Sequence, residues 1–241
     1  MMGPLINAAG IILGAVLPWV WKQPLSPRQQ RSLRLALGVF TVYFGLRLTW
    51  TSLHGNFLQI VKILGVVLLS MVFGKMIGKL LRLQKISNTL GQYANRKIGA
   101  ATQSTDQFND GFRVCAILFC AAPLAVLASA QEGVSGSLSP LFIVKAVMDG
   151  TASMAFASMF GKGVLFSALP VLAVETVLTR SASLAAPFLM NRPWPLDSAL
   201  LATDGILIFC VALIVLQFRR FEVADYFPSL FLAPLFMRLF W

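Results

Sequence analysis

Charged residues are scarce in this chain of 241 residues. Asp, Glu, Lys and Arg together make up 12% of it, whereas 57% of the residues are hydrophobic. A soluble domain typically carries about 25% charged residues. Half that share leaves too little polar surface to cover a water-soluble globule of this size. The composition therefore argues against an ordinary soluble domain and predicts a polytopic membrane protein.

The residues that most often build metal sites, disulfides and catalytic centres are also few. His54 is the single histidine, and Cys115, Cys120 and Cys210 lie in apolar runs without a CxxC pair. A lone histidine excludes a multi-histidine metal site, and an odd set of apolar-run cysteines argues against a disulfide framework. No GxSxG motif is present, and "VMDG" and "ADYF" do not supply the paired aspartates of intramembrane proteolysis. We therefore expect no enzyme, no metal and no cofactor.

Eight apolar stretches approach the roughly 20 residues that a helix needs to cross the hydrocarbon core. We predict an all-α integral membrane protein, a bundle of about eight transmembrane helices in a single domain over 1–241. The first stretch has no basic segment before it and no cleavage site behind it, so it reads as a retained helix. The last is short and contains Pro228 and Pro234, so it is expected to be broken or only partly spanning. The predicted spans are 4–21, 33–53, 57–81, 110–130, 140–160, 163–186, 197–217 and 224–240.

Basic residues lie between the apolar runs rather than on one soluble surface, although the net charge is +11. This distribution indicates membrane topology and argues against nucleic-acid binding. Connections 1–2, 3–4, 5–6 and 7–8 carry most of the lysine and arginine, whereas the other side has His54, Arg180, Arg192 and Arg238. Because cytoplasmic loops are enriched in these residues, we predict both termini outside.

The longest connection, 83–108, is predicted to be cytoplasmic. Leu83, Ile86, Leu90 and Tyr93 recur at helical spacing with basic residues between them. This pattern favours an amphipathic helix lying on anionic lipid. A solvated linker with a few apolar residues is the alternative.

The order of the spans allows an inverted repeat, with helices 1–3 and 6–8 running antiparallel around a central hairpin of helices 4–5. "GVFTVYFGL" (38–46) and "GILIFCVAL" (205–213) share a frame of small and apolar residues. A homodimer is also compatible with so small a bundle, although no motif demonstrates one.

A lysine and an aspartate stand four residues apart inside the apolar run "SPLFIVKAVMDGTASMAFASMF". Each costs roughly 2.5–3.5 kcal/mol at the centre of a membrane helix. Lys145 and Asp149 share a helix face and can form an ion pair. A hydrophobic pair would often be at least as stable, so stability alone does not explain them. Two readings stay open: a gated charge pair that takes a proton or cation, and a static pair that fixes helix packing.

Other polar residues in the spans are further pathway candidates. Glu175 has no charged neighbour in sequence, so it needs a partner from another helix or a proton. Asp204 lies nearer the outer side, where we expect a boundary residue in contact with water. Asp110 suits a helix start by dipole alone. Asn7, before "GIILG", is expected to make an interhelical hydrogen bond in a packing interface rather than to contact a ligand.

Several stretches resemble a known family: "GPLINAAGIILGAVL" at the N-terminus, 117–136, 143–172 and "VADYFPSLFLAPL" (223–235). They are similar to the prokaryotic membrane family called domain of unknown function 554. The resemblance implies a bacterial inner-membrane protein of several helices, loosely described as a candidate transport protein without an established substrate. Lys145, Asp149, Glu132, Gly133 and Gly136 fall at family-motif positions. The chain departs from the pattern at "AAP" (121–123), where relatives tend to carry glycine, and at Asp225, where they often carry asparagine.

Two functions compete on this evidence. One is a small transporter or channel for an ion or small solute that uses the intramembrane charges. The other is a membrane scaffold or partner-binding subunit whose basic cytoplasmic loops engage anionic lipid or another protein. A transporter is expected to have a polar cavity that reaches Asp149, whereas a scaffold would seal this residue in protein.

Overall fold

The computed structural model describes residues 2–20, 26–99, 106–190, 196–218 and 221–240. These residues are helical and form no strand, which confirms the all-α class. In chain order the elements are α1 (Met2–Val20), α2 (Pro27–Ser52), α3 (Phe57–Leu80), α4 (Leu83–Gly99), α5 (Gln107–Cys120), α6 (Pro123–Ser135), α7 (Pro140–Phe160), α8 (Gly163–Phe166), α9 (Ala168–Met190), α10 (Leu196–Val215), the 3-10 helix η2 (Val223–Tyr226) and α11 (Ser229–Phe240).

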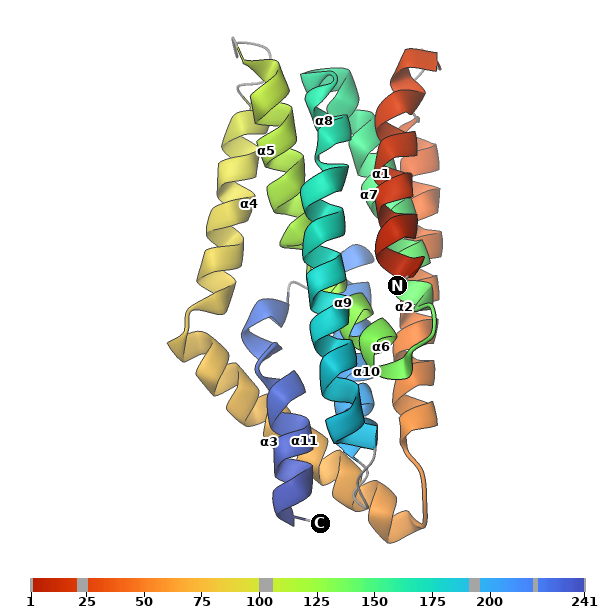
Figure 1. Ribbon diagram of the computed structural model, residues 1–241, viewed down its shortest axis with the longest axis vertical. Coiled ribbons are helices and arrows are strands. Elements are labelled where there is room, and N and C mark those ends of the chain that lie inside the picture. Colours follow the sequence, from red (N-terminus) through yellow and green to blue (C-terminus); the bar gives the residue numbers. More distant parts are fainter. Residues whose placement is uncertain (1, 21–25, 100–105, 191–195, 219–220, 241) are drawn as a thin grey trace.

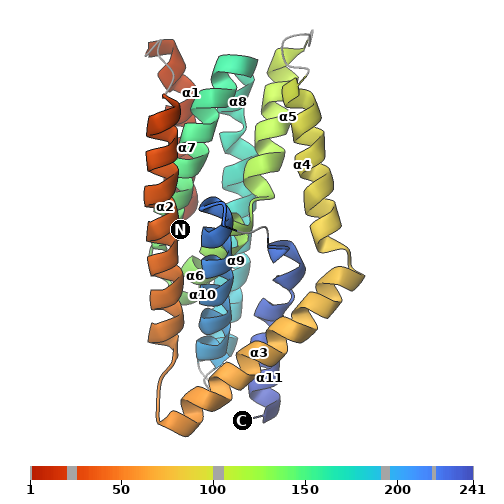
Figure 2. The same ribbon diagram turned by 180° about the vertical axis from the view of Figure 1, so that it is seen from behind.

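Most helices run along the long axis of the molecule, and α3 crosses its lower part obliquely (Figures 1 and 2). The C-terminal end of α1, the turn between α7 and α8, and the start of α5 lie together at the upper end. Lys162, in that turn, stands 6.0 Å from the ring centre of Trp19 on α1. The predicted connections 1–2 and 5–6 therefore share one end of the bundle, as the topology prediction requires. Which end faces the cytoplasm stays a prediction.

Within the described residues, six helical segments are long and apolar enough to cross a membrane, and the bent pair α5–α6 makes a seventh if it is counted as one span. The six are Met2–Val20, Phe57–Leu80, Pro140–Phe160, Gly163–Phe188, Asp197–Val215 and Val223–Phe240. α2 is 26 residues long but far less apolar, because it contains four arginines. The prediction of eight spans therefore stays a prediction, as does the inverted repeat.

The predicted span 110–130 is not one continuous helix. α5 ends at Cys120, α6 begins at Pro123, and the two are bent by 54° at the break. Proline has no N–H, so Pro123 cannot donate to the carbonyl of Phe119 four residues earlier. The break has a local cause, and it leaves the Phe119 carbonyl free for a donor from another helix.

Glycines let α1 and α7 approach almost to backbone contact. A Cβ added to Gly10 would crowd the carbonyl of Ala146, and one added to Gly14 would overlap the carbonyl of Gly150. In the other direction, a Cβ on Gly150 would stand 2.8 Å from the Gly10 oxygen. In lipid, such close packing is a main source of helix association, because burying apolar side chains brings little gain there. The two helices are therefore held at a separation that only small residues permit.

Within the predicted connection 83–108, α4 is helical as the pattern favoured, while its placement on anionic lipid stays a prediction. It is anchored by a segment 140 residues away. The backbone N–H of Gln84 donates to Oδ1 of Asp225 at 2.7 Å. The backbone N–H of Ala224 in turn donates to Oε1 of the Gln84 side chain at 3.2 Å. This exchange satisfies an amide that the first turn of α4 would otherwise leave without a partner. Gly78 packs against the Asp225 backbone, so η2 joins the end of α3 to the start of α4.

Large apolar side chains cover the outside of the bundle as well as its interior. Trp50, Leu80, Phe188 and Phe231 are at least 70% exposed and belong to α2, α3, α9 and α11. A soluble monomer rarely exposes apolar surface on this scale. The outward faces are those of helices that contact lipid.

We expect Gly14→Ala to lower the stability of the detergent-solubilised protein by about 1–3 kcal/mol, because the methyl group forces α1 away from α7. Gly65→Ala is the matched control, since a Cβ at Gly65 meets nothing within 4 Å. Denaturant unfolding measures both variants. Equal stability of the two would contradict the close contact.

A second prediction concerns the anchor of α4. Asp225→Ala removes the acceptor for the Gln84 amide and should cost about 1 kcal/mol, as loss of a helix cap does. Asp225→Asn keeps an oxygen acceptor and should remain close to wild type. Hydrogen exchange of the Gln84 amide checks this: exchange should accelerate in Asp225→Ala alone, and equal acceleration in both variants would show that the negative charge matters instead.

Candidate functional site

Four of the six predicted site residues come together in the centre of the bundle. Lys145 and Asp149 on α7 meet Asn7 of α1 and Glu175 of α9. Asn7 and Glu175 are 0% exposed, Lys145 is 1% exposed and Asp149 is 7% exposed. These four residues are called the central cluster below.

Asp149 is held by two donors. Lys145, one turn earlier on the same helix, forms an ion pair with its Oδ2, which confirms the predicted pairing. Nδ2 of Asn7 donates to the same oxygen at 3.1 Å. The interhelical hydrogen bond expected of Asn7 is thereby confirmed, and its acceptor is a charged group.

Glu175 finds its partners on two other helices. Nδ2 of Asn7 donates to its Oε1 at 2.8 Å, and Nζ of Lys145 lies 3.5 Å from the same oxygen. The sequence required a partner from another helix or a proton, and partners from α1 and α7 are present. Asn7 and Lys145 each bridge the two carboxylates.

A backbone group completes the surroundings of the lysine. Nζ of Lys145 donates to the Phe119 carbonyl at 3.1 Å, the oxygen that Pro123 leaves without a helical donor. A proline inside an apolar run, four residues after the acceptor, is the sequence signal for such a carbonyl, and our sequence analysis missed it. Broken membrane helices commonly use freed carbonyls in this way to line polar sites.

The glycine contact between α1 and α7 explains why the cluster forms. Asn7 lies one turn before Gly10, while Lys145 and Asp149 immediately precede Ala146 and Gly150. Bringing the two backbones together at these positions places the short Asn7 side chain within reach of Asp149. Packing and polar contact therefore depend on the same stretch of helix.

Glu132, a buried carboxylate, supports the cluster from the end of α6. Its Oε1 accepts from the Gly3 amide at 3.1 Å, and its Oε2 accepts from the Ser139 amide at 3.4 Å. A carboxylate is favourable at a helix N-terminus because of the helix dipole and the free N–H groups there. Glu132 therefore holds the N-terminal ends of α1 and α7 together, and this sets the positions of Asn7 and Lys145 along the two helices.

Asp110 lies apart from the central cluster. It is in the first turn of α5, as its sequence context predicted, and its Oδ1 stands 2.8 Å from Nζ of Lys97 on α4. The hydrogen bond that the Lys97 ammonium donates to the Asp110 carboxylate raises the pKa of Lys97. This pair joins α4 to α5 and has no contact with Asp149 or Glu175 among the described residues.

Asp204 was expected to touch water, and this expectation is wrong. The residue is 1% exposed in α10, and neither carboxylate oxygen has a hydrogen-bond partner in the described part of the chain. It shares a helix face with Leu200, Leu207 and Ile208, which pack in an apolar core. Hydropathy along one helix could not show that other helices cover this face.

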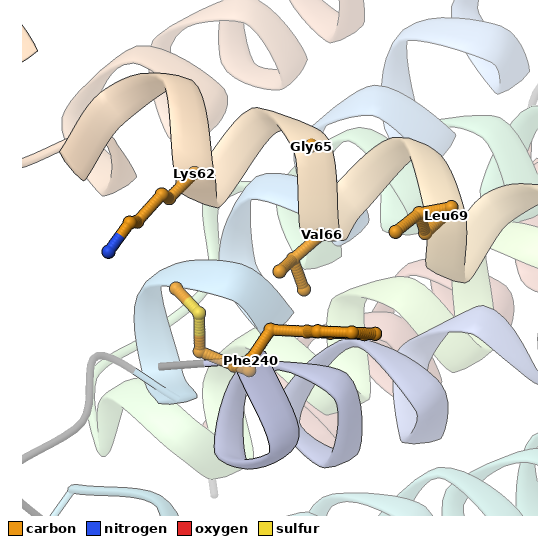
Figure 3. A pocket seen from close by; sticks show the side chains of 6 residues that line it. Lys62, Gly65, Val66, Leu69 and Phe240 are labelled. Atoms are coloured by element: carbon orange, nitrogen blue, oxygen red, sulfur yellow. The ribbon is translucent and has the colours of Figure 1, made fainter. Parts of the chain in front are cut away.

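A pocket of about 180 Å³ lies elsewhere, between α3 and α11. In Figure 3, Val66 and Phe240 face one another across it, with Lys62 to one side. Its lining is apolar apart from Lys62, and it shares no residue with the central cluster. It therefore gives no route to Asp149.

The helical bundle, the lipid-facing apolar surface and the buried charges define a multi-pass helical membrane protein. The chain belongs to the family described as "Protein of unknown function (DUF554)", whose model matches residues 2–238. This confirms the resemblance seen in the sequence.

Two curated relatives match along nearly the full length. The "Uncharacterized protein YqgA" of Escherichia coli (strain K12) is 28% identical over 235 residues, covering 97% of this chain and 94% of the relative. The "Uncharacterized membrane protein YdfK" of Bacillus subtilis (strain 168) is 23% identical over 234 residues, with the same coverage. No solved structure matches the chain.

We expect Lys145→Met to destabilise the protein strongly, by about 3–5 kcal/mol, because it leaves two buried carboxylates without their cation. Adding Asp149→Asn to this variant should restore part of the loss, since one of the two negative charges is then gone. Thermal unfolding in detergent compares the three proteins. A Lys145→Met protein as stable as wild type would contradict the energetic importance of the cluster.

Proposed function

We propose that this protein is a transporter or channel for an ion or small solute and that the central cluster is its switchable charged site. One observation carries the proposal: three helices and a broken fourth bring two carboxylates to a single ammonium group inside the bundle. Such an arrangement has one negative charge in excess and can respond to the arrival of a positive one.

Energetics support a functional role over a structural one. Each of the three charged residues costs a few kcal/mol to place within the membrane, even with its neighbours as partners. Close packing of small residues, as between α1 and α7, holds membrane helices together without that cost. Charges within transmembrane segments commonly mark ion or substrate pathways.

The central cluster is sealed from solvent in this conformation, with Lys145 and Glu175 at most 1% exposed. This is the arrangement expected above for a scaffold rather than for an open transport pathway. We take this conformation as the occluded state of the proposed cycle, because a site with alternating access must be closed to both sides at one stage. The break between α5 and α6 is the natural place for opening. α5 ends beside Lys145, so movement of this half-helix would uncover the cluster.

The alternative is a scaffold that binds anionic lipid through its basic segments. Lys79, Arg82, Lys85 and Arg96 are exposed on α3, α4 and the turn between them. Each basic residue near an anionic surface contributes about 1 kcal/mol of attraction. This surface is compatible with a transporter too, whereas the buried excess of negative charge has no role in a scaffold.

Flux measurements in proteoliposomes test the transport proposal. Purified protein should move at least one member of a panel of protons, alkali cations and small charged solutes, and Asp149→Asn should reduce that movement at least tenfold. Glu222→Gln is the matched control, because Glu222 is an exposed acid outside the central cluster, 3.9 Å from Nζ of Lys75. It should keep wild-type flux.

The scaffold becomes the better reading if folded protein moves nothing across the panel while a reference transporter works in parallel. Binding to vesicles containing anionic lipid, lost when the four exposed basic residues are neutralised, would then support it directly.

A further inference from the structure

The central cluster is one positive charge short. Asp149 and Glu175 bring two negative charges, and Lys145 brings one positive charge. The other titratable groups near them are the thiols of Cys115 and Cys120 on α5, which are not cations. A net negative charge buried this deeply is far too costly to persist without compensation. One further proton or cation must therefore belong to the cluster.

Unpartnered atoms indicate where this charge belongs. Oε2 of Glu175 and Oδ1 of Asn7 are buried and have no hydrogen-bond partner in the described residues. Both atoms belong to groups that are already joined by the 2.8 Å bond from Nδ2 of Asn7 to Oε1 of Glu175. Two acceptors thus lie on adjoining groups, and neither has a donor.

A proton on Glu175 supplies that donor. With Oε2 protonated, the carboxylic acid has one donor and one acceptor oxygen, and the Asn7 amide likewise has a donor group and an acceptor oxygen. A carboxylic acid and a primary amide can form two hydrogen bonds with each other in this way. The same proton brings the charge of the cluster to zero.

Glu175 is the better bearer of the proton than Asp149. Lys145 is in direct ion-pair contact with Asp149, whereas its Nζ lies 3.5 Å from Glu175. The ammonium group therefore stabilises the ionised form of Asp149 more than that of Glu175. A metal cation is disfavoured because the described residues contain no group of three or more His, Cys, Asp or Glu that could hold one.

We propose that Glu175 carries a proton in this conformation, hydrogen-bonded to the Asn7 amide, and that this proton is the ion which the central cluster releases and rebinds. The inference rests on the proposed transport function and names its ion. Facing Glu175 are Asn7 from α1, Lys145 and Asp149 from α7, Cys120 from α5, and the Ser129 hydroxyl from α6, which lies 3.5 Å from the Glu175 carbonyl. Loss of the proton leaves Lys145 shared between two carboxylates.

Infrared difference spectroscopy at neutral pH tests the assignment through the C=O stretch of a protonated carboxyl group. Asp204 is buried without partners and would contribute its own band, so the experiment uses Asp204→Asn protein throughout. We expect a protonated-carboxyl band that disappears in Glu175→Gln and remains in Glu222→Gln. Asp149→Asn should also remove it, because Lys145 then neutralises Glu175 without a proton. Glu175→Asp should shift the band, and Asp149→Glu should leave it in place. Asn7→Ala should keep the band but move it to higher frequency, because the acid loses its amide partner.

The last variant keeps the test decisive if Glu175→Gln does not fold. No band in the Asp204→Asn protein would overturn the proposal, as would a band that Glu175→Gln keeps, or one that Asp149→Glu shifts and Glu175→Asp does not. Stabilisation by sodium chloride but not choline chloride, without a band, would assign the missing charge to a metal cation instead. Flux without a protonated-carboxyl band would contradict the proton on Glu175 and still support the transport proposal. A band without flux would support the proton on Glu175 and contradict the transport proposal.

Discussion

The contact between one ammonium group and oxygens from three helices is the interaction on which the centre of this protein depends. Nζ of Lys145 meets Asp149 on its own helix, Glu175 on α9 and the Phe119 carbonyl at the end of α5. Each contact requires a separate feature of the chain. The carbonyl is free because of Pro123, Asp149 lies one helical turn after the lysine, and Glu175 is supplied by α9.

Packing and polarity support each other here rather than compete. Small residues let α1 approach α7, and this approach brings the Asn7 amide to both carboxylates. In turn, hydrogen bonds between helices are among the few forces that hold membrane helices together, since lipid removes most of the gain from burying apolar side chains. A substitution that changes the packing of α1 on α7 therefore also changes the polar contacts of the central cluster, and the reverse holds too.

The parts that depend on local pattern could be predicted from the sequence. Hydropathy located the apolar helices, and the spacing of Lys145 and Asp149 predicted their pairing. The parts that depend on neighbouring helices could not. Glu175 needed a partner that no sequence neighbour could supply, and Asp204 was assigned to water although other helices cover it. The break before Pro123 was missed because hydropathy averages over a window and reports the length of an apolar run, not its continuity.

The position of the break has a mechanical consequence for the proposed proton. While Glu175 is protonated, Lys145 can satisfy Asp149 and the Phe119 carbonyl together, so the end of α5 is held to α7. Once the proton leaves, Glu175 becomes a second carboxylate that attracts the same ammonium group, and a charged acceptor outcompetes a neutral carbonyl. The bond to Phe119 is then the weakest of the three. Loss of one proton would thus loosen α5 at the very point where its helix is already interrupted, which links the charge of the cluster to the access of solvent to it.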